Sequence, residues 1–478
     1  MSQQIINHVT ESTEKKRGIH RVFYSARQTL RHYASGGNVL IVATLLALIV
    51  ANIPGLNNLY FDFWNQEVRL QVGDFNIFSH AGHPMTVLQF INDALMAIFF
   101  FTIGLEIKRE VLVGELASIR QALLPIIAAV GGMAVPVLIF FIMGHGSDYT
   151  DGAAIPMATD IAFSLGILGM LGSRVPISLK IFLTTLAVVD DIGGIIVIAA
   201  FYSGHIQAMF LIYALALLLV LYIGGRMGVQ SKMFYFIIGG IVWFLFLNSG
   251  IHPTIAGVLV AFCVPAVPVY APVRYIKIIR TSIGHFRKED DAALNARTFL
   301  SHDQMDRLKE IESASDKVIS PLQDLEDSLH PVVNYLIIPL FAFANAGIYL
   351  LDLQPATIFT GLSLAIIVSL IVGKFAGILG FSYLAVKMKL APMPERSDWK
   401  MIAAVALLGG IGFTVSLFIA NLSFDPSTAA GARLLDMAKL GIVVGSLIAG
   451  AGGYLLLKKW LPISSQDDET DACPLDFK

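Results

Sequence analysis

The feature that most constrains this chain is a series of apolar segments, each about as long as a helix that crosses a lipid bilayer. A bilayer core of ~30 Å is spanned by about 20 helical residues. Segments near that length begin at about residues 38, 86, 121, 153, 176, 207, 231, 251, 331, 357, 399 and 433. They show neither strand alternation nor the dyad pattern of a lipid-facing barrel. We therefore predict an all-α polytopic membrane protein with twelve transmembrane helices.

Composition excludes a soluble protein. Apolar residues make up 56% of the 478 positions and charged residues only 14%, whereas soluble domains contain about 25% charged residues. A soluble chain this apolar could not cover its surface with polar groups. The net charge of −2 provides no global field for nucleic acid. The two cysteines, Cys263 in an apolar segment and Cys473 near the C-terminus, exclude a disulfide framework.

The basic residues orient the predicted spans. If both termini are cytoplasmic, all but four of the 33 Lys and Arg residues lie on the cytoplasmic side. Arg69 and Arg433 fall on the opposite side, and Lys374 and Lys439 fall within spans. This distribution follows the positive-inside rule, so we expect both termini in the cytoplasm. The first 35 residues are basic and have no apolar core, so we expect no cleaved signal peptide.

Polar stretches divide the chain into parts. We predict a basic cytoplasmic arm at 1–36, transmembrane helices one to eight at 37–270, a long cytoplasmic loop at 271–330, transmembrane helices nine to twelve at 331–460, and a cytoplasmic tail at 461–478. The arm suits the anionic inner leaflet. Residues 57–84 are expected to form an external hairpin-like loop. The loop 271–330 is interpreted as a solvated helix without chemistry, because its apolar residues follow helical spacing.

Five charged side chains lie inside the predicted spans. They are Asp93, Asp160, Asp190, Asp191 and Lys374. A charge at the bilayer centre costs at least ~2.5–3.5 kcal/mol, so each of them is a candidate functional residue. The Asp pair lies about 14 residues into its span, or ~21 Å, and Lys374 is too deep for its ammonium to reach the surface. A structural ion pair is the alternative, but one pair leaves three carboxylates without a basic partner.

The adjacent aspartates predict a cation site. Neighbouring helical residues point about 100° apart, so Asp190 and Asp191 cannot share one face. One of them can pair with Lys374 while the other faces a water-filled cavity. Small hard cations such as Na⁺ or Li⁺ take oxygen ligands, and a carboxylate binds them only when deprotonated, so protons and cations compete. Competition at a site that opens alternately to each side suffices for obligatory exchange, without a cofactor.

Two spans contain residues that interrupt helices. The fourth places Pro156 and Thr159 beside the buried Asp160, and the eleventh has three glycines and two hydroxyl residues within 409–416. Interrupted segments in corresponding places of two halves indicate a transporter site near the membrane midplane. Half-helix ends carry partial charges that Asp160 and Lys374 would neutralise. Close helix packing is the alternative explanation of the glycines.

Ten short motifs follow one another along the chain from about residue 34 to 460. They are ASGG at 34–37, INDALMAIF at 91–99, GLEIKRE at 104–110, ATDIAF at 158–163, LGSRVP at 171–176, KIFL at 180–183, VDDIG at 189–193, PLFAFANAG at 339–347, GK at 373–374 and GIGFTVSLF at 410–418. In these motifs and in their order the chain resembles the NhaA family of bacterial sodium/proton antiporters, which is built from inverted repeats.

The resemblance implies roles for the buried residues. Asp191 would be the main carboxylate for cation and proton, and its neighbour Asp190 would be paired to Lys374 in one state. Thr159 and Asp160 would sit where the discontinuous fourth and eleventh helices cross. The resemblance also implies a bacterial inner membrane location, Na⁺, Li⁺ and H⁺ as transported ions, contact with membrane lipid, and a homodimer formed through the external hairpin.

A pH-responsive cytoplasmic cluster is a further implication of the resemblance. Its positions carry over to Glu106, Glu110 and Glu326, with His330 beside them, and His252 at the start of the eighth span is a further candidate. Capping or hydrogen bonding is an equally open interpretation of the two histidines. Asp93 also matches a family position, and polar packing near the ion path is the alternative for it.

The chain departs from the usual family pattern in three places. The arm at 1–36 and the loop at 271–330 are longer, and Asp327 stands where a basic residue or His is familiar. Because the loop adjoins the predicted pH-responsive cluster, these departures bear on the pH setting more than on transport.

Together these features predict a secondary transporter and not an enzyme. It would exchange cytoplasmic Na⁺ or Li⁺ for external protons, electrogenically and under pH regulation, in pH homeostasis. A proton-coupled symporter or a channel for another small solute is the alternative, and would need a larger mixed pocket. An intramembrane aspartyl protease is disfavoured, because Gly-x-Gly-Asp is absent and Lys374 would hold one Asp ionised.

Overall fold

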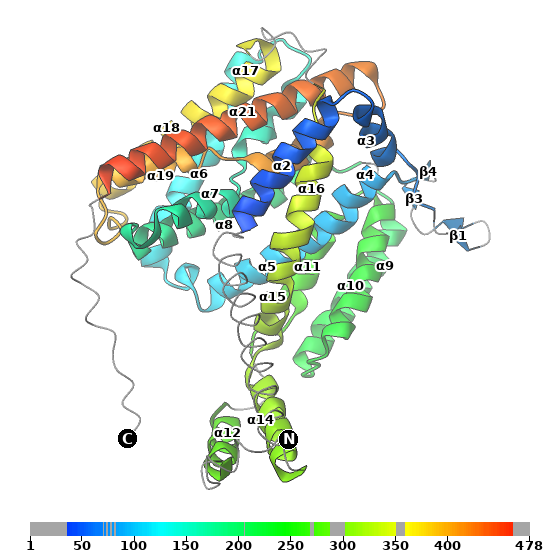
Figure 1. The fold of residues 1–478 in the computed structure, drawn as a ribbon, viewed down its shortest axis with the longest axis vertical. Helices are drawn as coiled ribbons and strands as arrows, with labels where there is room; N and C mark the ends of the chain where they lie inside the picture. The colour runs from blue at the N-terminus through cyan, green and yellow to red at the C-terminus, as the bar shows by residue number, and fades with distance from the viewer. Residues whose placement is uncertain are drawn as a thin grey trace, which may run out of the picture.

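The computed structural model describes residues 36–461, with gaps at 70, 73–74, 77–78, 81–82, 205, 268–271, 287–301 and 350–358. The described part is a bundle of mostly apolar helices (Figure 1). Apart from one residue each, the predicted arm 1–36 and tail 461–478 lie outside the described residues, as does the middle of the predicted loop 271–330.

Some candidate membrane spans are single uninterrupted helices. They are α6 Ile119–Met143, α8 Ile177–Phe201, α9 Ala208–Arg226, α10 Lys232–Ser249 and α21 Ala429–Trp460. In Figure 1, α9 and α10 lie side by side at one edge of the bundle. Many of their leucine, isoleucine and methionine side chains are exposed, as expected of helices that face lipid.

Other candidate spans change helix type along their length. Three contain a π-helical turn: α4 Val87–Phe90, η1 Ile91–Leu95 and α5 Met96–Leu112 in the first; α15 Pro321–Val332, η5 Val333–Ile337 and α16 Ile338–Asn345 in the second; α17 Gly361–Val368, η7 Ser369–Gly373 and α18 Lys374–Lys387 in the third. A further span joins the 3₁₀ helix η3 Thr150–Met157 to α7 Ile161–Met170. Such turns often mark functional sites.

Two helix pairs are bent at short breaks. The angle is 115° between α2 Gly36–Asn52 and α3 Leu56–Trp64, and 42° between α19 Trp399–Leu408 and α20 Phe413–Ser423. The first bend follows Pro54 and uses Gly55 at φ +88°, a left-handed conformation that glycine adopts without steric cost. Within the described ranges, nine helices are long and apolar enough to cross a membrane, or eleven if each bent pair is one span.

The predicted eighth span is shorter than expected. It corresponds to α11 Thr254–Cys263, whose ten residues extend about 15 Å at 1.5 Å per residue. The helix ends because Val264 adopts an extended conformation before Pro265, as residues before proline usually do. An apolar stretch from 251 therefore yields a helix that does not meet the length of a membrane span, and twelve spans stay a prediction.

The polar stretches contain more helix than the sequence suggested. The region 57–84 begins within α3 and continues as two short hairpins, β1 Gln71–Val72 with β2 Phe75–Asn76, and β3 Ser79–His80 with β4 His83–Pro84. Single 3₁₀ turns form η2 Glu115–Ala117 and η4 Gly172–Arg174. Two helices of the loop, α12 Pro272–Phe286 and α14 His302–Val318, lie together beyond the end of α15 (Figure 1).

The ninth helical segment starts about ten residues before the predicted start at 331. Ser320 caps α15 by accepting a hydrogen bond from the backbone N–H of Gln323 at 3.3 Å, and Pro321 suits the first helical position. Leu322, Leu325 and Leu329 then lie one helical turn apart and are buried. The acidic residues between these leucines place the segment in the predicted cytoplasmic loop 271–330, and its apolar face shows that it continues into the ninth span.

Close backbone approach holds α6 against α18. A Cβ atom added to Gly377 would lie 2.7 Å from the carbonyl carbon of Gly131, and one added to Gly373 would lie 2.7 Å from the Cα of Pro136. Small residues are the usual means by which membrane helices approach closely. This contact matters for the site because α18 begins with Lys374.

We predict that Gly377→Ala lowers the stability of the protein by about 1–3 kcal/mol, because the new methyl group must displace the α6 backbone. Thermal unfolding of the purified protein in detergent measures the effect. Gly380→Ala is the matched control on the same helix, since a Cβ there would contact nothing within 4 Å. Equal melting temperatures for the two variants would contradict the prediction.

Candidate functional site

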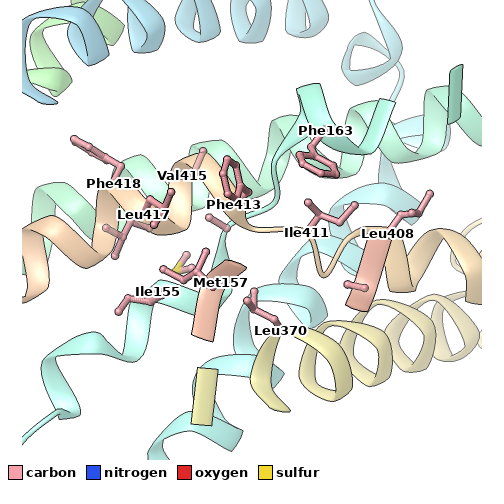
Figure 2. Close-up of a cluster of buried hydrophobic side chains, with 14 of the residues drawn as sticks. Ile155, Met157, Phe163, Leu370, Leu408, Ile411, Phe413, Val415, Leu417 and Phe418 are labelled. Carbon is pink, nitrogen blue, oxygen red and sulfur yellow. The ribbon is translucent and has the colours of Figure 1, made fainter. Parts of the chain in front are cut away.

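Two interrupted segments meet at their breaks. Residues 158–160 are extended between η3 and α7, and residues 409–412 separate α19 from α20. The backbone N–H of Asp160 donates to the carbonyl of Ile411 at 2.6 Å, and the Ser164 hydroxyl donates to the carbonyl of Leu408 at 3.2 Å. Each break thereby satisfies polar groups that the other leaves without helical partners. Buried apolar side chains, Ile411 among them, surround this contact (Figure 2).

Asp160 joins the N-termini of two half-helices. Its Oδ1 accepts from the backbone N–H of Phe163 at 3.0 Å and so caps α7. Its Oδ2 accepts from both the backbone N–H and the hydroxyl of Thr414, at 3.0 and 2.6 Å, in the first turn of α20. A carboxylate in this position satisfies free N–H groups and matches the positive ends of both helix dipoles.

Lys374 and Asp190 form a fully buried ion pair. The Lys374 Nζ lies 2.6 Å from Asp190 Oδ2, and both side chains are 0% exposed. The same ammonium donates to the Thr159 hydroxyl at 2.9 Å. That hydroxyl lies 2.6 Å from Asp190 Oδ2 and 2.9 Å from the Gly409 carbonyl, to either of which it can donate its proton. The end of α19 is therefore linked to the ion pair through Thr159.

Asp191 faces in a different direction from its neighbour. It lines a cavity of about 660 Å³, together with Thr159, Asp160 and Thr414 from the two breaks, whereas Asp190 does not line it. The 100° step along α8 separates the two carboxylates in this way. Among the described residues, the buried Oδ1 of Asp191 has no hydrogen-bond partner. This leaves a carboxylate oxygen available to a cation or a proton that enters the cavity.

The donor set fits a small hard cation better than a resident transition metal. Within the described ranges, no group of three or more His, Cys, Asp or Glu side chains is arranged to hold a metal ion. The cavity instead offers carboxylates and hydroxyls, the oxygen ligands that hard cations take.

The predicted pH-responsive residues divide between the cavity and its surroundings. Glu106 and His330 line the cavity, and His330 is exposed, so the cavity extends from buried Asp191 toward the surface at this end. Glu326 is buried and bonds the guanidinium of Arg109. The same guanidinium contacts Glu110 at 3.1 Å. Arg109 therefore holds two of the glutamates together beside the cavity.

Asp93 and His252 lie together but apart from this group. His252 Nε2 is 3.7 Å from Asp93 Oδ1, and its Nδ1 is 2.8 Å from the Thr254 hydroxyl. Neither residue lines the cavity that contains Asp191. Asp93 belongs to the π-helical turn η1, whose backbone carbonyl at Asp93 accepts from the Trp243 indole at 3.1 Å.

Several polar residues of the site were not singled out from the sequence. They are Thr102 and Asn334 in the cavity wall, Arg109 between the glutamates, and three asparagines that contact one another, Asn92, Asn345 and Asn421. The signal that could have found the asparagines is a carboxamide within an apolar run, as in the motifs INDALMAIF and PLFAFANAG.

The fold and the buried charges define a multi-pass membrane protein with a polar site inside its helix bundle. The chain matches the family model described as Na⁺/H⁺ antiporter 1 over residues 27–457. It therefore belongs to the Na⁺/H⁺ antiporter 1 family, and the resemblance inferred from its motifs is confirmed.

Curated relatives cover nearly the whole chain. It is 53% identical over 445 residues to the Na(+)/H(+) antiporter NhaA of Phocaeicola vulgatus, which covers 92% of this chain and 96% of the relative. The proteins of the same name from Parabacteroides distasonis and Porphyromonas gingivalis W83 are 53% and 47% identical, covering 89% of this chain in both cases and 93% and 94% of the relatives. These relatives are named as antiporters, so the family is one of transporters and not of enzymes.

The buried ion pair generates a stability prediction. Lys374→Met leaves the Asp190 carboxylate buried without its counter-ion and should lower the stability by about 3–5 kcal/mol. Adding Asp190→Asn should restore most of that loss, because no uncompensated charge then remains. Thermal unfolding of the single and double variants in detergent measures both steps. Lys400→Met, at an exposed lysine of α19, is the control and should melt like the parent. A double variant no more stable than the single variant would refute the pairing.

Proposed function

We propose that the protein is a secondary active transporter that exchanges cytoplasmic Na⁺ or Li⁺ for external protons. Membership of the Na⁺/H⁺ antiporter 1 family supports the exchange, as do the names of relatives such as that of Phocaeicola vulgatus. The single observation that carries the proposal is the placement of Asp191. Its carboxylate lines the cavity and has a buried oxygen without a hydrogen-bond partner among the described residues, and the adjacent Asp190 pairs with Lys374.

Competition at Asp191 provides the exchange. A cation binds the deprotonated carboxylate, and a proton displaces it, so the two cannot occupy the group together. Asp190 is held by Lys374 in the described state and becomes a second ligand when that pair separates. If Asp190 and Asp191, or Asp191 and Lys374, take up protons as one cation leaves, two charges exchange for one. Transport is then electrogenic.

The two facing breaks, at 158–160 and 409–412, support alternating access to the site. The proposed arrangement has twelve transmembrane helices in inverted repeats, with the discontinuous fourth and eleventh helices crossing at Thr159 and Asp160. It places the protein in the bacterial inner membrane with both termini in the cytoplasm. Membrane lipid surrounds the bundle, and a second copy associates through the region 57–84.

Regulation by pH is assigned to the group beside the cavity. Glu106 and His330 line the path to Asp191, while Arg109 ties Glu110 to Glu326. Protonation of Glu326 weakens its bond to the guanidinium of Arg109, which links pH to the relative positions of α5 and α15. The Asp93–His252 contact, at 3.7 Å, is proposed as a further part of this response.

Asp191→Asn should abolish exchange and leave the protein folded, because the amide cannot release a proton or bind a cation as a carboxylate does. Dissipation of an imposed pH gradient by Na⁺ or Li⁺ in everted membrane vesicles measures the exchange. Asp62→Asn, at an exposed aspartate of α3, is the matched control and should exchange at the parental rate. Sustained exchange by the Asp191 variant would refute the site assignment, and absence of exchange in the parent would refute the function.

A membrane potential that is negative on the side the protons enter should accelerate Na⁺-driven proton movement in proteoliposomes, and the opposite potential should slow it. Each net charge moved per cycle gains about 2.3 kcal/mol per 100 mV, and two protons for one cation move one net charge. Proton flux is followed with a trapped pH indicator at several potassium diffusion potentials. A flux that is indifferent to the potential would show that one proton exchanges for one cation.

A further inference from the structure

Three asparagines form a hydrogen-bonded bridge at the end of the bundle beyond the cavity. Asn345 is 0% exposed. Its amide nitrogen donates to Asn92 Oδ1 at 2.8 Å and to the Phe341 carbonyl at 3.0 Å. Its amide oxygen accepts from Asn421 at 3.0 Å. The carboxamide of Asn345 therefore uses both its nitrogen and its oxygen in hydrogen bonds.

The asparagine bridge, defined as Asn92, Asn345 and Asn421, links three separate segments. Asn92 belongs to η1, Asn345 ends α16, and Asn421 lies in α20. Hydrogen bonds between side chains hold membrane helices together at modest strength. The bridge therefore ties α20, which carries Thr414 at the site, to two helices outside the breaks.

All three segments place the bridge on the same side of the cavity. Cavity-lining residues on these helices are Phe99 on α5, Ile338 on α16 and Val415 on α20. Asn92 precedes the first by seven residues, and Asn345 and Asn421 follow the other two by seven and six. At 1.5 Å per residue, each asparagine lies ~9–10 Å along its helix from the cavity wall. The opposite end of the cavity carries Glu106 and the exposed His330.

An aromatic layer separates the bridge from the cavity. Phe418 lies between Val415 and Asn421 on α20, farther from the break than Val415 (Figure 2). Its ring centroid is 5.6 Å from that of Phe100 and 5.4 Å from that of His252. Phe418 and Phe100 are both buried.

We propose that the asparagine bridge and the Phe418 layer are the gate that closes the ion site toward the membrane face opposite the cavity. The proposal rests on the proposed exchange function, since only a transporter must open its site to both faces. Opening requires α20 to separate from α16 and η1. Each hydrogen bond between carboxamides that breaks is then replaced by a hydrogen bond to water. Hydrogen bonds between carboxamides suit a gate because they form again when the water leaves.

Cross-linking the bridge tests the gate. Asn345→Cys and Asn421→Cys are introduced together in a variant in which Cys263 and Cys473 are replaced by Ser, and a short bifunctional thiol reagent joins them. Na⁺/H⁺ exchange in proteoliposomes should fall at least tenfold on cross-linking and return on reduction. The cross-linked protein should still gain thermal stability from Na⁺, because the cavity side stays open to it.

The outcomes separate the gate from the function. Exchange at an unchanged rate in fully cross-linked protein would overturn the gate and leave the proposed function intact. Absence of exchange in the parent and in the reduced variant would overturn the proposed function, and the gate with it. Loss of the stabilisation by Na⁺ on cross-linking would also count against the gate, since it would show that the cross-link damages the site.

Weakening the bridge tests it from the other direction. Asn345→Ala should raise the rate at which a membrane-impermeant thiol reagent labels Val415→Cys from the face opposite the cavity, about five- to tenfold. That factor corresponds to about 1–1.4 kcal/mol, at 1.4 kcal/mol per tenfold. This free energy matches the loss of two interhelical hydrogen bonds between carboxamides. Vesicles of both orientations distinguish the two faces.

Asn248→Ala is the matched control for this experiment. The Asn248 carboxamide donates to the Phe244 carbonyl on its own helix at 2.9 Å, so its removal should leave labelling unchanged. Equal labelling rates in the Asn345→Ala variant and the parent, with both proteins monodisperse, would overturn the proposal. Equal acceleration in the Asn248→Ala variant would do the same, since it would show a general loosening of the bundle.

Discussion

No backbone N–H or C=O inside a bilayer can be left without a partner, and this constraint governs the centre of the molecule. A span that breaks exposes such groups, and here two breaks satisfy each other. The backbone of Asp160 bonds the carbonyl of Ile411, and the backbone of Thr414 bonds the side chain of Asp160. Either break alone would leave these groups unpaired in an apolar bundle. The two interrupted segments are therefore stable only in contact, which brings Thr159, Asp160 and Thr414 to one place.

The charges around the breaks follow from the same requirement. Asp160 satisfies the N-terminal ends of α7 and α20, where negative charge is favourable. Lys374 neutralises Asp190, and Thr159 connects this pair to the end of α19. Among the described residues, Asp191 has no ion pair although it lies beside these groups. This is why we propose Asp191 as the carboxylate whose charge depends on what enters the cavity.

Much of the site could be predicted from the sequence, because a charge within a long apolar segment is costly and stands out. The 100° step between adjacent helical residues also predicted that one of Asp190 and Asp191 pairs with Lys374 and the other faces a cavity. Which of the two pairs depends on the rotation of α8 against α18, and that is a tertiary property. In the structure the partner of Lys374 is Asp190.

The remaining features depend on packing that local sequence does not encode. The π-helical turns η1, η5 and η7 each insert one residue into a continuous apolar helix, and no residue type marks them. The distribution of basic residues places Arg109 on the cytoplasmic side but does not predict its partners. In the structure it joins Glu110 to Glu326. The apolar stretch from 251 gave too long a span because Pro265 ends α11 early. Asparagines in apolar segments are a weak signal, because burying a carboxamide costs less free energy than burying a charge.

The difference in strength between the contacts of α20 indicates how the molecule can move. At its first turn, α20 is held by two hydrogen bonds from Thr414 to a carboxylate, and bonds to charged groups are the stronger kind. At Asn421 it is held by a hydrogen bond between uncharged carboxamides, from Asn421 to Asn345. Such a bond contributes roughly 0.6 kcal/mol between membrane helices. In the proposed gate, a displacement of α20 would therefore break the asparagine bridge before it breaks the contact at Asp160. Because the strong contact lies at the ion site and the weak one beyond it, the half-helix can separate from α16 while the site itself stays assembled.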